Sequence, residues 1–236
     1  NSIGMVVVDS TSTGTNSGII NITGNSSAGV YNVGTFTMTG GSITASTPSS
    51  VGVYAKTASN TNVNGGTVTV SGGSTALYSE TGATIRLLNP TVINVNDKSL
   101  MFYRSGTGAL SGTATGNINN GGTAFYITGG NTPNISSLVT TGNLALNMAT
   151  GSTLVGWDQP TGTLSLNALA GVLGTPAVTN TTINDLSGGT YRYFVINKAN
   201  VLVDRNTTLS GTGSQYFPRV NFVSSSIQVG SGFTVT

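Results

Sequence analysis

The 236-residue chain contains 34 glycines, only 6% charged residues and no cysteine or histidine, and its net charge is +2. The basic residues are scattered rather than clustered, so nucleic-acid binding is not expected. Without cysteine a disulfide framework is excluded. With histidine also missing, thiol chemistry and the usual catalytic triads are excluded, and a zinc site is not expected.

Apolar residues make up 37% of the chain and alternate with threonine, serine and asparagine along short runs, as in residues 35–39. A period of two is typical of half-buried strands rather than of a disordered segment. Two further strand-like runs, at residues 5–8 and 19–22, lie on either side of a region rich in serine, threonine and glycine. The pattern therefore predicts an all-β protein.

A phrase of a small or apolar residue, an apolar residue and a tyrosine recurs every 23–25 residues, and Gly4-Met5-Val6 fits as an earlier copy. A fixed period of this size indicates one structural unit stacked on itself. Each unit also holds two alternating runs separated by a turn dipeptide. We therefore predict a parallel β-helix with three short strands per coil of about 24 residues. The five tyrosine copies are Gly29-Val30-Tyr31, Gly52-Val53-Tyr54, Ala76-Leu77-Tyr78, Met101-Phe102-Tyr103 and Ala124-Phe125-Tyr126, and the turn dipeptides are Gly40-Gly41, Gly65-Gly66 and Asn89-Pro90.

The side of the strand that faces the core can be argued from alternation. Lys56 and Glu80 lie two residues after a tyrosine and share its face, and both favour water. The tyrosines are therefore predicted to lie outside, with the middle position of the phrase in the core. The alternative assignment would bury the rings and expose the middle position.

Two regions are expected within one solenoid. Residues 1–130 form regular coils, and residues 131–236 form irregular coils with longer loops, because the phrase is lost there although strand-like runs continue. Residues 167–173 are the one expected helical turn. Both ends of the chain are expected to continue into a longer protein.

The acidic residues give little support to catalysis. The spacings between the six acids are not multiples of one period, although Asp185 and Asp204 are candidates for neighbours one coil apart. Glycosidases need two carboxylates in one cleft, and calcium repeats need aspartate at a fixed place in every coil. We expect neither, and therefore predict no catalytic residues, no metal and no cofactor.

The candidate ligand-binding residues are Trp157, Asp158 and Gln159, which lie on a loop between glycine and proline. Trp157 is either a contact anchor, as tryptophan often is at binding hot spots, or an indole packed against the coil beneath. Asp158 and Gln159 would supply polar contacts. The tyrosine ladder is either a platform for sugar rings or a partner, or a stack that holds the coils in register, and we favour the stack.

The repeats in residues 29–43 and 52–70 resemble passenger domains of type V autotransporters, and most closely the very large fusobacterial-type outer-membrane adhesins. This resemblance implies a right-handed helix displayed at the cell surface, with a signal peptide and a C-terminal membrane barrel outside this sequence. It also implies a virulence-associated adhesin that attaches to host or bacterial cells through surface glycans or proteins, and we expect a monomer. The alternatives are a non-binding stalk and, with less support, a carbohydrate-active β-helix enzyme.

Overall fold

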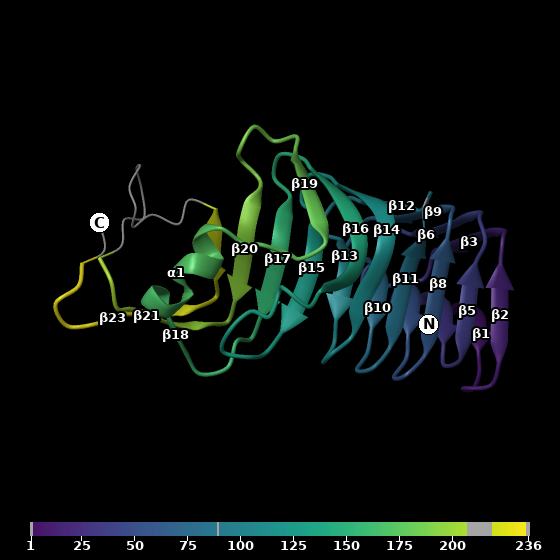
Figure 1. Cartoon of the computed structure of the whole chain (residues 1–236), viewed down its shortest axis with the longest axis horizontal. Helices are drawn as coiled ribbons and strands as arrows, with labels where there is room; N and C mark the ends of the chain where they lie inside the picture. The colour runs from purple at the N-terminus through teal and green to yellow at the C-terminus, as the bar shows by residue number, and fades with distance from the viewer. Residues whose placement is uncertain (1, 89, 207–218, 235–236) are drawn as a thin grey trace.

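The computed structural model describes residues 2–88, 90–206 and 219–234 (Figure 1). The chain is an all-β solenoid of about nine turns, with about 25 residues per turn. All strand pairings among the described residues are parallel. The predicted parallel β-helix is confirmed, while its handedness stays an expectation from the resemblance.

The repeated phrase forms one continuous nine-stranded sheet along the molecule. Its middle residues stand in register from coil to coil, and Val53, Leu77 and Phe102 are fully buried. The prediction that the middle position faces the core and the tyrosine faces outward is confirmed. The strands, in order, are β1 (Ile3–Val7), β4 (Ala28–Asn32), β7 (Val51–Ala55), β10 (Thr75–Ser79), β13 (Leu100–Arg104), β15 (Thr123–Thr128), β17 (Thr153–Asp158), β20 (Arg192–Asn197) and β22 (Val220–Val223).

The second sheet begins as two columns of short strands. The predicted glycine pairs separate them and adopt positive φ, as at Gly65 (85°) and Gly66 (79°), a conformation that glycine adopts without strain. One column is β2 (Thr13–Asn16), β5 (Thr35–Met38), β8 (Asn60–Asn64) and β11 (Thr84–Leu88), and the other is β3 (Ile19–Ile22), β6 (Ser42–Ala45), β9 (Thr67–Val70) and β12 (Val92–Val95).

The two columns merge on one long strand, β14 (Ala109–Ile118). Its first half pairs with β11 and its second half with β12, so this coil has two strands where three were predicted. The turn dipeptide of the earlier coils is missing here, and the strand continues through the corner. β16 (Val139–Met148) and then β19 (Thr181–Asp185) extend this side of the solenoid.

The last coils carry a third, smaller sheet and a helix. The sheet consists of β18 (Thr163–Ser165), β21 (Asn200–Val203) and β23 (Ser226–Val229). Helix α1 (Leu166–Gly174) follows β18 and confirms the predicted helical turn. The Ser165 hydroxyl caps it by accepting a hydrogen bond from the Ala168 amide at 3.0 Å. In Figure 1, α1 lies beside the strands of this small sheet, toward the C-terminal end.

Polar residues also stack from coil to coil. The amide of Asn117 donates to Asn94 at 2.8 Å, Asn147 donates to Asn117 at 2.7 Å, and Asn184 donates to Asn147 at 2.9 Å. At a corner between strands, the Ser99 hydroxyl accepts from the Ser74 amide at 3.2 Å. Such ladders satisfy side chains between coils and hold the strand register.

Candidate functional site

The five repeated tyrosines form a stack along the outer face of the nine-stranded sheet. Neighbouring ring centroids lie 4.4–5.2 Å apart, and the ring planes differ by 8–24°. At these separations each inner ring covers the faces of its neighbours, so a sugar finds no free aromatic face between them. The stack therefore supports the interpretation of a register device. Its members are Tyr31, Tyr54, Tyr78, Tyr103 and Tyr126.

The ladder ends where Gly156 replaces tyrosine in register with Tyr126. A Cβ atom at Gly156 would lie 2.6 Å from Cδ2 of the Tyr126 ring. The missing side chain therefore makes the space in which the last ring of the ladder packs.

Glu80 ties the ladder to a neighbouring turn. Its carboxylate accepts hydrogen bonds from the Tyr54 hydroxyl at 2.6 Å and Lys56 Nζ at 2.9 Å, and from the amide and hydroxyl of Thr57 at 3.0 and 2.7 Å. Burial raises the pKa of Glu80, but these hydrogen bonds outweigh burial and lower the pKa to about 2. Burial and the same carboxylate raise the pKa of Tyr54. Lys56 and Glu80, from which the outer face was predicted, thus form an ion pair with each other.

The three predicted ligand-binding residues do not form one exposed surface. Trp157 is fully buried, and its indole N–H donates to the Gly129 carbonyl at 2.7 Å. Asp158 points to the other face of the strand, where its carboxylate lies 3.7 Å from Lys198 Nζ. Gln159 is exposed at a turn with φ of 51°. Trp157 therefore belongs to the core, and its interpretation as an exposed contact anchor is not supported.

The acidic residues considered for catalysis occupy separate networks. Asp185 accepts hydrogen bonds from the amide and hydroxyl of Ser187, and these bonds lower its pKa. Asp204 accepts from the Ser165 hydroxyl and from the Asn167 amide at the start of α1, and these bonds also lower its pKa. Each carboxylate is thus engaged in holding a turn or a helix end in its own sheet.

Within residues 2–88, 90–206 and 219–234, no group of three or more acidic side chains lies close enough together to hold a metal ion. In the same residues, no helix has both the length and the apolar character needed to span a bilayer.

Arg104, the last residue of β13, was not among the predicted site residues. It stands in register between Ser79 and Ile127, in a column that faces the interior, and the residue is only 9% exposed. Burial lowers the pKa of the guanidinium. Alternation already indicated this orientation, because Arg104 directly follows a tyrosine that faces outward.

A loop from the next coil folds over the guanidinium, and we call residues 129–138 the cover loop. Arg104 Nη1 donates to the Ser137 hydroxyl at 2.8 Å, and Nη2 donates to the Asn134 carbonyl at 2.5 Å. The loop is also anchored from inside, because Ile135 and Leu138 are buried in the core. Its position is therefore fixed by packing as well as by the arginine.

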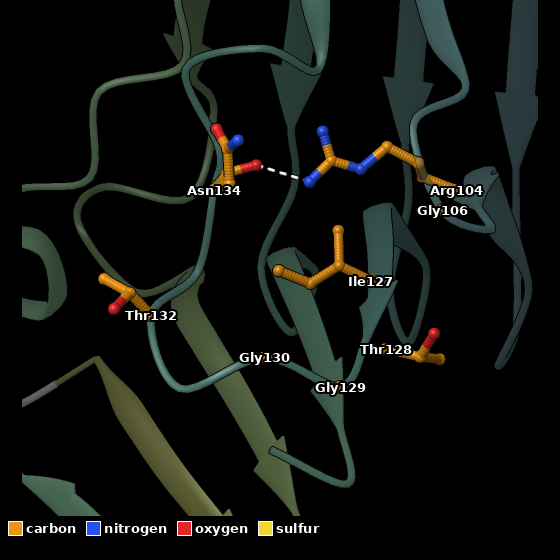
Figure 2. Close-up of a pocket in the computed structure, with 8 residues that line it drawn as sticks. All are labelled: Arg104, Gly106, Ile127, Thr128, Gly129, Gly130, Thr132 and Asn134. Atoms are coloured by element: carbon orange, nitrogen blue, oxygen red, sulfur yellow. Dashed lines mark hydrogen bonds between the residues drawn. The ribbon is translucent and has the colours of Figure 1, made fainter. Parts of the chain in front are cut away.

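A pocket of about 150 Å³ lies between the cover loop and the ends of β13 and β15 (Figure 2). Figure 2 shows the guanidinium reaching from β13 toward Asn134, with the Ile127 side chain beside the gap. The pocket thus combines one buried cation, one apolar wall, two threonines and three glycines. Its lining residues are Arg104, Gly106, Ile127, Thr128, Gly129, Gly130, Thr132 and Asn134.

The fold defines this chain as a parallel β-solenoid built from a tyrosine-marked repeat. No protein-family model matches the chain, and neither curated proteins nor solved structures gave a match.

Proposed function

We propose that this chain is a non-catalytic binding segment of a surface-displayed bacterial adhesin, which attaches to glycans or proteins on host or partner cells. The observation that supports this proposal is the pocket beneath the cover loop. It lies where the regular coils give way to longer loops, and binding residues concentrate on loops that a rigid scaffold positions.

The solenoid suits this role mechanically. Each coil is bonded to the next through the backbone and through the tyrosine and asparagine ladders. Such an array is stiff along its axis and exposes long faces, on which repeat proteins often bind partners. The autotransporter class, the cell-surface location and the monomeric state belong to the same proposal.

The proposal is tested by measuring whether the whole purified chain attaches to cell and glycan surfaces. Beads coated with the purified protein are applied to host cells, to partner bacteria and to an array of surface glycans. We expect saturable binding to at least one of these surfaces, which soluble chain reduces in competition. Absence of binding on all three would contradict the proposal and favour the stalk.

A second measurement separates binding from turnover. The chain is incubated with surface polysaccharides, and the products are examined for new reducing ends or unsaturated sugars. We expect the polysaccharides to remain intact. Cleavage that is lost in Asp185→Ala or Asp204→Ala would favour the enzyme instead.

A further inference from the structure

The pocket beneath the cover loop contains a positive charge that no acidic side chain of the described residues neutralises. All six acidic residues lie in the described ranges, and the ion pairs there use Lys56, Lys198 and Arg219. None of these pairs includes Arg104. A buried cation is costly unless it is paired, so this position favours an anion from outside the chain.

The guanidinium also has hydrogen-bonding capacity left. It carries five N–H donors, and within the described residues it donates only to the Asn134 carbonyl and the Ser137 hydroxyl. No polar side-chain atom of the described residues is buried without a partner. Nε makes no hydrogen bond among the described residues and is therefore not sealed from solvent, and Arg104 lines the pocket, where an incoming acceptor can approach this edge of the guanidinium.

The other residues that line the pocket, and its volume, limit the kind of anion that can bind beside Arg104. Ile127 offers an apolar surface, and two exposed residues, Thr128 and Thr132, also line the pocket. At about 30 Å³ per water molecule, the pocket holds the volume of about five waters, which fits an acidic group and a few carbons rather than a whole ligand. One guanidinium neutralises one charge, and its planar fork matches a carboxylate in two parallel hydrogen bonds.

We propose that the pocket formed by Arg104 and the cover loop binds the carboxylate of an acidic sugar, with the sugar ring extending out past Thr132. The carbons next to the carboxylate contact Ile127. The choice of a sugar rests on the proposed attachment to cell-surface glycans, while the carboxylate site itself rests on the arginine and the pocket.

The probes are D-glucuronate, the neutral D-glucose as its matched control, and inorganic sulfate as a different anion. Each is titrated into the intact chain at low salt and followed by amide and arginine Nε–H NMR shifts. We expect saturable shifts at Gly130, Thr132 and Arg104 with glucuronate only. Equal binding of glucose, stronger binding of sulfate, or no saturable shift in the pocket would overturn the proposal.

Variants assign the effect to the pocket. Arg104→Gln removes the charge and is expected to weaken glucuronate binding about tenfold or more, as for loss of a charge-assisted hydrogen bond. Arg86→Gln makes the same change on the exposed face of β11 and is expected to leave binding unchanged. Equal affinity in Arg104→Gln and the unmodified chain, or an equal loss in Arg86→Gln, would overturn the proposal.

Arg104 also holds the cover loop, so a second variant is needed that leaves its bonds intact. Thr132→Phe places a ring at the exposed rim and is expected to abolish glucuronate binding. The indole N–H signal of Trp157, which donates to Gly129 at the start of the loop, reports whether the loop keeps its place. Undiminished binding in Thr132→Phe with that signal unchanged would overturn the proposal.

The two proposals fail separately. If cells bind the chain while glucuronate does not enter the pocket, the carboxylate site is wrong and attachment uses another surface. If glucuronate binds in the pocket while no cell or glycan surface holds the chain, the adhesin function is wrong and the site stands.

Discussion

Replacement of Glu80 by glutamine tests whether the hydrogen bonds between coils stabilise the solenoid. The carboxylate accepts from Tyr54, Lys56 and Thr57, and its side chain is 16% exposed. A pKa lowered from 4.5 to about 2 corresponds to about 3 kcal/mol if solvent did not screen the charges. Because solvent reaches the group, we expect Glu80→Gln to cost about 1–2 kcal/mol at pH 7.

The pH dependence follows from the direction of this shift. Because the folded-state pKa is lowered, the stabilisation by Glu80 is fully present above pH 4.5 and is lost as the pH falls toward 2. Urea unfolding followed by circular dichroism should therefore separate Glu80→Gln from the unmodified chain at pH 7, and the two curves should converge near pH 2. Exchange of the Thr57 amide, which donates to Glu80, should also be faster in the variant at pH 7.

The matched control is Asp97→Asn, which changes a carboxylate to an amide at an exposed turn. We expect this control to leave the urea midpoint at pH 7 within the error of the measurement. Equal stability of Glu80→Gln and the unmodified chain at pH 7, or a deficit of the variant that is the same at pH 7 and near pH 2, would contradict the stabilising role of the Glu80 carboxylate.

Three further substitutions probe the core and the ladder by urea unfolding. Phe102→Ala empties a fully buried position and should destabilise the chain by about 3–5 kcal/mol; a loss below 1 kcal/mol would contradict the burial. Gly156→Ala brings a methyl group against the Tyr126 ring and should cost about 1–3 kcal/mol, and an increase in stability would refute the contact. Trp157→Phe leaves the Gly129 carbonyl without its donor and should cost about 1–3 kcal/mol, whereas an exposed indole would make the change neutral.

Much of the fold was predictable because each coil repeats the same alternation of apolar and polar residues and the same turn residues. Alternation places Leu77 and Phe102 in the core, and the glycine pairs turn the chain between strands. Parallel stacking then brings equivalent residues of successive coils into register, which explains the tyrosine ladder. The helix was predictable from its own short apolar run, which begins just after the capping Ser165.

The merged strand β14 was not predicted, because a missing turn is a weaker signal than a turn. Residues 109–118 keep the alternation of the earlier coils but lack the paired glycines. β16 pairs with β14 along its length, apart from an irregularity near Gly112, so the next coil also passes this position without a turn.

Trp157 shows how an insertion hides a repeat. In register, Val155 pairs with Phe125 and Gly156 with Tyr126, so residues 154–156 are a further copy of the phrase without its tyrosine. The cover loop lengthens this coil, and the copy arrives 30 residues after the previous one, since Gly156 follows Tyr126 by that number. Once this register is known, alternation alone places the indole inside.

Arg104 was hidden for a different reason. Its inward orientation follows from the tyrosine before it, but the same column carries Ala55, Ser79 and Ile127, none of which needs a counter-charge. Its acceptors come from residues 134 and 137, about one coil later, in the stretch where the repeat fails. An inward charge in a stacked repeat is therefore the signal to examine, because the next coil must either neutralise it or leave room for a ligand that does.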